Sequence, residues 1–126
     1  MPHNLMEHRK AAERRGHLSE SLAALWLRLK GYRILERRIK TRLGEIDLVA
    51  AAPFGPVCFI EVKARGLARS AAEAVTAGQR ARIARAALFY LAGRPHLSRR
   101  GARFDIIAIA PRAFPVHHRD VWQAKF

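Results

Sequence analysis

The chain has 126 residues, of which 50% are apolar, and its 24 Lys and Arg against 10 Asp and Glu give a formal net charge of +14. This length and composition predict one folded domain, residues 1–126, and argue against disorder. No apolar run approaches the roughly 20 residues of a membrane-spanning helix, and the N-terminus lacks a signal-peptide core, so we expect a cytoplasmic protein without membrane contact. The single cysteine, Cys58, excludes an internal disulfide and is most simply a core residue.

The positive charge is the first clue to a partner. An excess of this size works against compact folding by self-repulsion, so it favours a polyanionic partner. We expect nucleic acid, most simply DNA, because Lys and Arg neutralise its phosphates. RNA, a ribosome or anionic lipid would satisfy the same charge, and a basic bias of the coding sequence would need no partner at all.

The first predicted element is a helix over residues 7–30, which Gly31 ends. Residues 1–16 either belong to its start or form a flexible basic arm. An apolar stripe at helical spacing predicts the core-facing side of this helix and consists of Leu18, Leu22, Leu25, Trp26 and Leu29. Glu20 lies off this stripe, beside Ala24 and Leu27, where small neighbours let a helix approach a sheet closely.

A strand is predicted at residues 32–40, followed by two more, GEIDLVA at 44–50 and FIEVKAR at 59–65. The connection at 51–56 holds two prolines and a glycine, which favours a hairpin between the last two strands. Arg42, just before this hairpin, is a candidate clamp for a phosphate, although such a residue is more often simply exposed.

Carboxylates stand inside both strands of the hairpin. With the two-residue period of a strand, Glu45 and Asp47 share a face, as do Glu61 and Lys63. Antiparallel pairing brings Asp47 beside Glu61, with Lys63 one step along. Burying an unpaired charge is costly, so such positions normally carry Val or Ile. We interpret the pair as a site that holds a divalent metal against a phosphate; the alternative is an ion-paired hairpin, Glu61 with Lys63 and Asp47 with Arg42.

The second half of the chain reads as a basic loop at 65–69, an S-x-x-E capping box at 70–73 and a helix running to about residue 91. The apolar contacts of this helix are expected from Ile83, Ala87, Phe89 and Leu91. A strand is predicted at 103–109, and the tail at 113–126 can add a last strand.

Asp105 stands in the apolar stretch of that strand and is expected to be buried. We favour a structural role for it, such as pairing with an Arg, over metal ligation. Phe54 and Trp122 are interpreted as packing residues rather than platforms for stacked bases. The six histidines show no spacing typical of a zinc site.

The ordered set GEIDLVA, FIEVKAR, EAV (73–75) and RFDIIAI (103–109) resembles the YraN family of predicted endonuclease-like proteins, within the PD-(D/E)xK superfamily. The resemblance covers the chain from about Ser19 to its C-terminus. It implies an α/β fold with a restriction-endonuclease-like core, a mixed central β-sheet flanked by helices. It also implies a metal-dependent DNA endonuclease that hydrolyses phosphodiester bonds, of branched or single-stranded DNA in repair or recombination. Three positions differ from the residues that are usual in this family. Ser19 stands in place of Gly, Arg38 in place of Asn, and Gln79 near the place of a frequent Lys.

The resemblance also assigns roles to residues of this sequence. Asp47, Glu61 and the carbonyl of Val62 would hold Mg²⁺ or Mn²⁺. The expected catalytic residues are Asp47, Glu61, Lys63 and Glu20, the supporting residues are Glu45 and Gln79, and the nucleic-acid contacts are Arg42 and Arg65. Many nucleases of this fold dimerise, so a homodimer is among the expectations. The rival hypothesis is a catalytically inactive DNA- or RNA-binding module of the same fold.

Overall fold

The computed structural model describes the backbone of residues 2–64 and 75–123, and side chains from residue 16 onward within these ranges. Over these residues the helices are α1 (Pro2–Leu29), α3 (Ala77–Ala92) and α4 (Pro95–Ser98). The strands are β1 (Arg33–Lys40), β2 (Glu45–Ala51), β3 (Val57–Lys63), β4 (Ala102–Ala108) and β5 (Val116–Trp122). The strands expected from the sequence, including the last one in the tail, are confirmed, and α1 begins earlier than expected.

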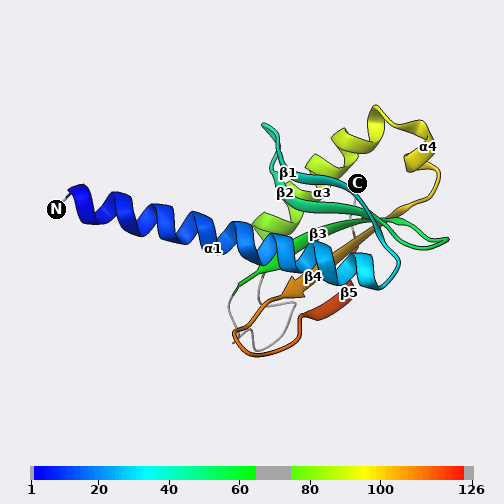
Figure 1. Ribbon diagram of the computed structural model, residues 1–126. Coiled ribbons are helices and arrows are strands. Elements are labelled where there is room, and N and C mark those ends of the chain that lie inside the picture. Colours follow the sequence, from blue (N-terminus) through cyan, green and yellow to red (C-terminus); the bar gives the residue numbers. More distant parts are fainter. Residues whose placement is uncertain (1, 65–74, 124–126) are drawn as a thin grey trace.

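The five strands form one sheet in the order β1-β2-β3-β4-β5 (Figure 1). Neighbouring strands are antiparallel except β3 and β4, which are parallel. A parallel pair needs a long crossover, and α3 lies in the connection between these two strands. The expected α/β fold, a mixed sheet flanked by helices, is confirmed, and it is compatible with a restriction-endonuclease-like core.

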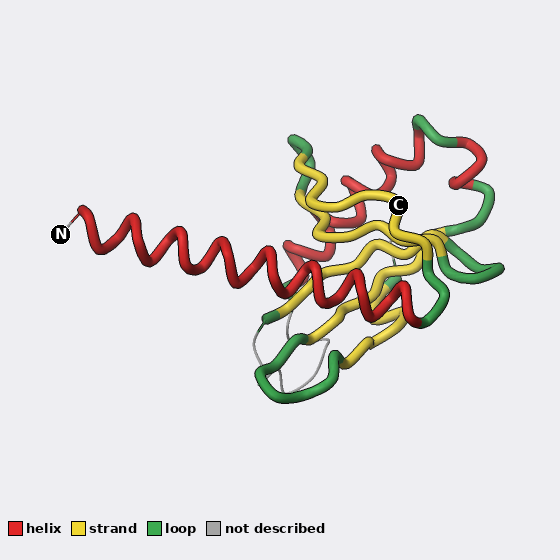
Figure 2. Tube along the Cα trace, in the orientation of Figure 1, coloured by secondary structure: helices red, strands yellow, loops and turns green. Residues whose placement is uncertain are grey.

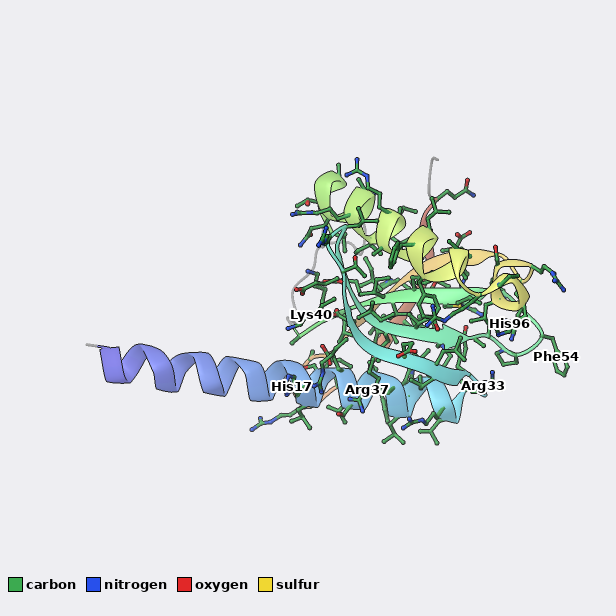
Figure 3. The ribbon with its side chains drawn as sticks, turned by 90° about the horizontal axis from the view of Figure 1, so that it is seen from above. His17, Arg33, Arg37, Lys40, Phe54 and His96 are labelled. Carbon is green, nitrogen blue, oxygen red and sulfur yellow. The ribbon has the colours of Figure 1, made fainter. Side chains whose placement is uncertain are left out.

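The molecule has three layers, with α1 on one face of the sheet and α3 on the other (Figures 2 and 3). Two hydrophobic clusters fill the spaces between them. The cluster under α3 includes Val57, Phe59, Phe104, Ile106, Ile83, Ala87 and Tyr90. The cluster under α1 includes Leu48, Ile60, Ile107, Ala23, Ala24, Leu27 and the buried Cys58. Both faces of the central strands are therefore covered, which explains their nearly continuous apolar sequences.

The packing of α1 overturns one expectation. The buried side of the helix consists of Ser19, Ala23, Ala24 and Leu27, whereas the stripe expected to face the core is largely exposed. Leu18 is 60% exposed and Leu29 is 72% exposed. Small side chains at Ala23 and Ala24 let the helix backbone come close to the sheet, and the larger leucines then point away from it. The N-terminal half of α1 extends past the edge of the sheet (Figure 1).

Among the described residues, α1 has the length to cross a bilayer but lacks the apolarity, and the other helices are too short.

Helix α3 begins with a capping box formed by Thr76 and Gln79. The Thr76 hydroxyl accepts a hydrogen bond from the Gln79 N–H (3.2 Å), and the Gln79 side-chain oxygen accepts one from the Thr76 N–H (3.0 Å). The loop at 65–69 and the capping box predicted at 70–73 lie outside the described residues.

Two aromatic residues do not pack as expected. Phe89 is 64% exposed because it lies on the side of α3 away from the sheet. Phe54 is fully exposed at the tip of the β2–β3 hairpin, where it points away from the body of the protein (Figure 3). Trp122, in contrast, is buried and stacks on Phe104 at a ring-centre distance of 5.2 Å, as expected of a packing residue.

Asp105 is fully buried and organises the α1 side of β4 and β5. The Arg103 guanidinium donates to both of its carboxylate oxygens, at 2.9 and 2.8 Å. His117 Nε2 lies 2.8 Å from Asp105 Oδ2, and the Asp120 N–H donates to Oδ1 at 3.0 Å. Arg103 also donates to the Tyr32 hydroxyl at 2.7 Å. The expected pairing of Asp105 with an Arg is therefore confirmed, whereas the contact with His117 was not foreseen.

Candidate functional site

Asp47 and Glu61 face each other across the β2–β3 ladder. The ladder pairs Leu48 with Ile60, so the next step of the same register sets Asp47 opposite Glu61. Val57 and Phe59 belong to the cluster under α3, and the two-residue period of β3 then places Glu61 on that same face. The two carboxyl groups lie close enough to affect each other's pKa.

The electrostatics of this pair are unusual for carboxylates. Burial, then the charge of Glu61 and that of Glu20, raise the pKa of Asp47 to about 7, although the Val62 N–H donates to Asp47 Oδ2 at 2.8 Å. Burial also raises the pKa of Glu61, against the attraction of Lys63. Desolvation and like charge both disfavour two ionised carboxylates here. Near neutral pH the pair therefore favours a shared proton or a bound cation.

Lys63 and Val62 complete the arrangement at the end of β3. Lys63 Nζ lies 3.4 Å from Glu61 Oε1. The Lys63 carbonyl accepts from the Ile109 N–H at 2.7 Å, on the side of β4. Because successive residues of a strand direct their backbone polar groups to opposite edges, the Val62 carbonyl points toward β2, as its N–H does. The Val62 carbonyl therefore lies on the Asp47 side of β3, where the family resemblance implies a metal ligand.

A hollow of about 350 Å³ opens between this part of the sheet and the first turns of α3. Its lining is formed by Gly44, Glu45, Asp47, Glu61, Gln79, Arg82 and Ile83. The structure therefore brings the expected supporting residues, Glu45 and Gln79, to the carboxylate pair. Arg82 was not foreseen at the hollow. The signal for it was its spacing from Gln79, because residues three apart on a helix share a face.

Three other expected residues have different positions. Glu20 forms an ion pair with Arg38 and lies close enough to Asp47 and Glu61 to affect the pKa of both. Arg42 is exposed and lines a separate hollow beside Phe89. Arg65 lies outside the described residues.

The donors at the pair suit a hard divalent cation. In the part of the chain that the structure describes, no group of three His, Cys, Asp or Glu side chains could hold a metal. Two carboxylates with a nearby backbone carbonyl are all oxygen donors, which fit Mg²⁺ or Mn²⁺ and not a thiolate or imidazole metal. Mg²⁺ is commonly held by one or two carboxylates, the remaining positions being taken by water and substrate phosphate. The residues present therefore fit such an ion.

Comparison with known proteins gives consistent matches over this region. A sequence model described as "Uncharacterised protein family UPF0102" matches residues 19–109. A UPF0102 protein of Paramagnetospirillum magneticum is 48% identical over 118 residues, covering 90% of this chain and 91% of the relative. A UPF0102 protein of Agrobacterium fabrum is 49% identical over 114 residues, covering 90% and 93% of the two chains. One of Rhodopseudomonas palustris is 50% identical over 109 residues, covering 86% and 83%.

Proposed function

The chain belongs to the UPF0102 family, and we propose that it is a metal-dependent nuclease that hydrolyses phosphodiester bonds of DNA. The observation that carries the proposal is the placement of Asp47 and Glu61 on neighbouring strands, where both line one hollow of the sheet. Two half-buried carboxylates that repel each other are stabilised by a divalent cation. The order Asp47, Glu61, Lys63 also supports the finer assignment to the YraN type within the PD-(D/E)xK superfamily.

The residues at and around the carboxylate pair have distinct roles in this proposal. Asp47, Glu61 and the Val62 carbonyl would hold Mg²⁺ or Mn²⁺. When bound, the ion supplies Lewis-acid polarisation of a phosphate and a lowered pKa for water. The Lys63 ammonium, 3.4 Å from Glu61, is placed to orient the attacking water and to stabilise charge on the phosphate oxygens as it develops.

The remaining residues support substrate and metal. Glu20 and Glu45 add negative charge around the cation site, and Gln79 lines the hollow from the first turn of α3. Arg82, one turn further along α3, is placed to contact a phosphate. The net charge of +14 supports nucleic acid as the substrate class, since phosphate neutralisation by Lys and Arg drives such binding.

One observation favours a second candidate, a catalytically inactive DNA-binding module of nuclease fold. Lys63 already forms an ion pair with Glu61 at 3.4 Å. A lysine committed to that pair would satisfy one carboxylate without any metal. The module would bind DNA with the same affinity in the presence and absence of divalent ions, and would cut nothing.

Calorimetric titration with MnCl₂ tests the metal site. We expect Asp47→Asn and Glu61→Gln each to weaken Mn²⁺ binding by about 10- to 100-fold or more, because each removes an anionic ligand. The matched control is Glu36→Gln, which removes a half-buried carboxylate from β1 outside the hollow and should leave the affinity unchanged. Equal Mn²⁺ affinity in all four proteins would reject the site.

A cleavage assay then decides between the two candidates. Labelled single-stranded, duplex, flapped and four-way-junction DNA, with RNA as a comparison, are incubated with Mg²⁺, Mn²⁺ or EDTA. We expect metal-dependent cleavage of at least one DNA, and a loss of about 10²- to 10³-fold in Lys63→Ala with most of the DNA affinity retained. Lys40→Ala, which removes an exposed lysine of β1, should cut at the wild-type rate at saturating DNA. Tight DNA binding without any cutting would establish the binding module instead.

A further inference from the structure

Helix α1 carries a second apolar face that points away from the protein. Its four leucines, here called the leucine seam, are Leu18, Leu22, Leu25 and Leu29, with exposed fractions of 60%, 41%, 51% and 72%. A helix turns by about 100° per residue, so this seam lies almost opposite the buried face of Ser19, Ala23, Ala24 and Leu27. A helix with apolar side chains on both faces needs a cover on each, and the sheet provides only one of them.

The spacing of the seam is that of a coiled coil. Successive leucines are four, three and four residues apart, which is the pattern of a and d positions in a heptad. The spacings read four, three and four from either end of the seam, so two antiparallel copies can align their leucines. A two-fold axis at the middle of the seam would therefore set Leu22 opposite Leu25 of another copy, and Leu18 opposite Leu29.

The apolar surface continues beside the seam. Phe114, from the β4–β5 connection, is 81% exposed, and its ring lies 5.8 Å from that of Trp26. Leu18, Leu22 and Phe114 line a groove of about 630 Å³ together with Pro111 and Pro115. An exposed apolar surface of this continuity is typical of an interaction site.

We propose that the leucine seam binds the leucine seam of a second copy of this chain, antiparallel and related by a two-fold axis. Between Leu18 and Leu29 the helix carries only two charged side chains, Glu20 and Arg28. Glu20 lies toward the sheet, where it pairs with Arg38, so Arg28 is the one charged side chain of this segment beside the seam, and no like charge of the segment opposes it in the antiparallel register. A lipid surface would instead require several cations flanking the apolar face; Arg28 is the one within this segment and Arg112 lines the adjoining groove, so vesicle sedimentation distinguishes the two occupants.

The dimer is independent of the nuclease proposal. Glu20 belongs to the sheet-facing side of α1, where it pairs with Arg38, so pairing through the seam leaves the hollow at Asp47 accessible. The salt response also separates the two proposals. Two chains of charge +14 repel each other, so NaCl strengthens the dimer by screening, whereas it weakens DNA binding.

Sedimentation equilibrium of the full chain over a range of concentrations, at low and high NaCl, measures the dimer directly. We expect a monomer–dimer equilibrium in the wild type that tightens with salt. Leu22→Glu should raise the dimer dissociation constant by about 10- to 100-fold, because it places a carboxylate at the centre of the seam. The matched control is Leu88→Glu on α3, where the leucine is 49% exposed but outside the seam, and it should dimerise like the wild type.

A double variant tests the direction of pairing. In Leu22→Glu/Leu25→Lys, antiparallel chains bring the new carboxylate at position 22 against the new ammonium at position 25, so dimerisation should recover relative to either single variant. Parallel chains would bring like charges together and dissociate. Circular dichroism checks that all variants keep the fold, as expected for exposed positions.

Three outcomes would overturn the proposal: a wild type that stays monomeric at high salt and concentration, Leu22→Glu dimerising like the wild type, or a double variant weaker than both single ones. If the wild type is monomeric but sediments with phosphatidylserine vesicles through Leu22, the seam is a lipid-binding face and the dimer is rejected.

Discussion

The backbone of Arg82 lies directly against Gly44. A Cβ atom at position 44 would stand 2.7 Å from the Arg82 carbonyl oxygen and 2.9 Å from its carbonyl carbon, both closer than such contacts occur. Gly44 precedes β2 and Arg82 lies in α3, so this contact sets how closely the helix approaches the start of the strand. Both residues line the hollow that contains Asp47 and Glu61. The absence of a side chain at Gly44 therefore determines the width of the candidate site.

Gly44→Ala should destabilise the protein by about 1–3 kcal/mol, because the opposing atoms belong to backbone and must move with the helix. Urea unfolding measures this loss. Gly93→Ala is the control, since a Cβ there meets no atom within 4 Å and φ is −87°. That change should stay within about 1 kcal/mol of the wild type in either direction. Equal effects of the two substitutions would show that α3 does not depend on the contact.

The raised pKa of Asp47 predicts a specific pH dependence of stability. The carboxyl has an ordinary pKa of 3.8 and a pKa of about 7 in the folded protein, so the folded state binds the proton more tightly. The contribution of this group to stability is therefore highest below about pH 3.8 and is lost as pH rises toward about 7.

Asp47→Asn keeps an acceptor for the Val62 N–H. Because the amide does not ionise, the variant does not lose stability at this position as the pH rises. In EDTA the variant should be more stable than the wild type by on the order of 2–4 kcal/mol at about pH 8, with the difference shrinking toward about pH 4. Thermal or urea unfolding at both pH values measures it. Mn²⁺ should then stabilise only the wild type. If the stability gain of Asp47→Asn over the wild type were the same at both pH values, ionisation of Asp47 could not be its cause.

DNA binding should depend strongly on salt. The logarithm of the affinity for duplex DNA is expected to fall linearly with the logarithm of salt concentration, with a slope of about −0.9 per phosphate contact. Arg82→Ala should reduce the magnitude of the slope by about one contact if this residue holds a phosphate at the hollow. Arg99→Ala, which removes an exposed arginine beyond the other end of α3, should leave the slope unchanged. A flat salt dependence would contradict nucleic-acid binding.

The hairpin of β2 and β3 was predictable because its signals are local. A turn with two prolines and a glycine favours antiparallel pairing, and the strand period then places Asp47 beside Glu61. Glu20 lies on the sheet side of α1 with the buried Ala24 and Leu27, although the sequence favoured the leucine stripe as the core face.

Contacts between distant segments were not predictable. The leucine stripe of α1 has the stronger helical periodicity, so sequence reasoning chose it as the core face, but the sheet selects the side with small residues. The same limit applies to His117, whose contact with Asp105 depends on the pairing of β4 with β5. An adjacent pair of histidines in a tail carries no local signal of that register.

Removal of the Asp105 carboxylate should strongly destabilise the fold. Burial opposes its ionisation, but hydrogen bonds from His117, Arg103 and the Asp120 N–H outweigh burial and hold the pKa of Asp105 below its usual value. Asp105→Ala leaves the mostly buried Arg103 guanidinium without its anion, and we expect a loss of about 3–5 kcal/mol in urea unfolding. Asp120→Asn removes the same charge from an exposed side chain and should change stability by at most about 0.5 kcal/mol. If Asp105→Ala instead kept its stability and lost Mn²⁺ binding, the residue would be a metal ligand rather than the organiser of β4 and β5.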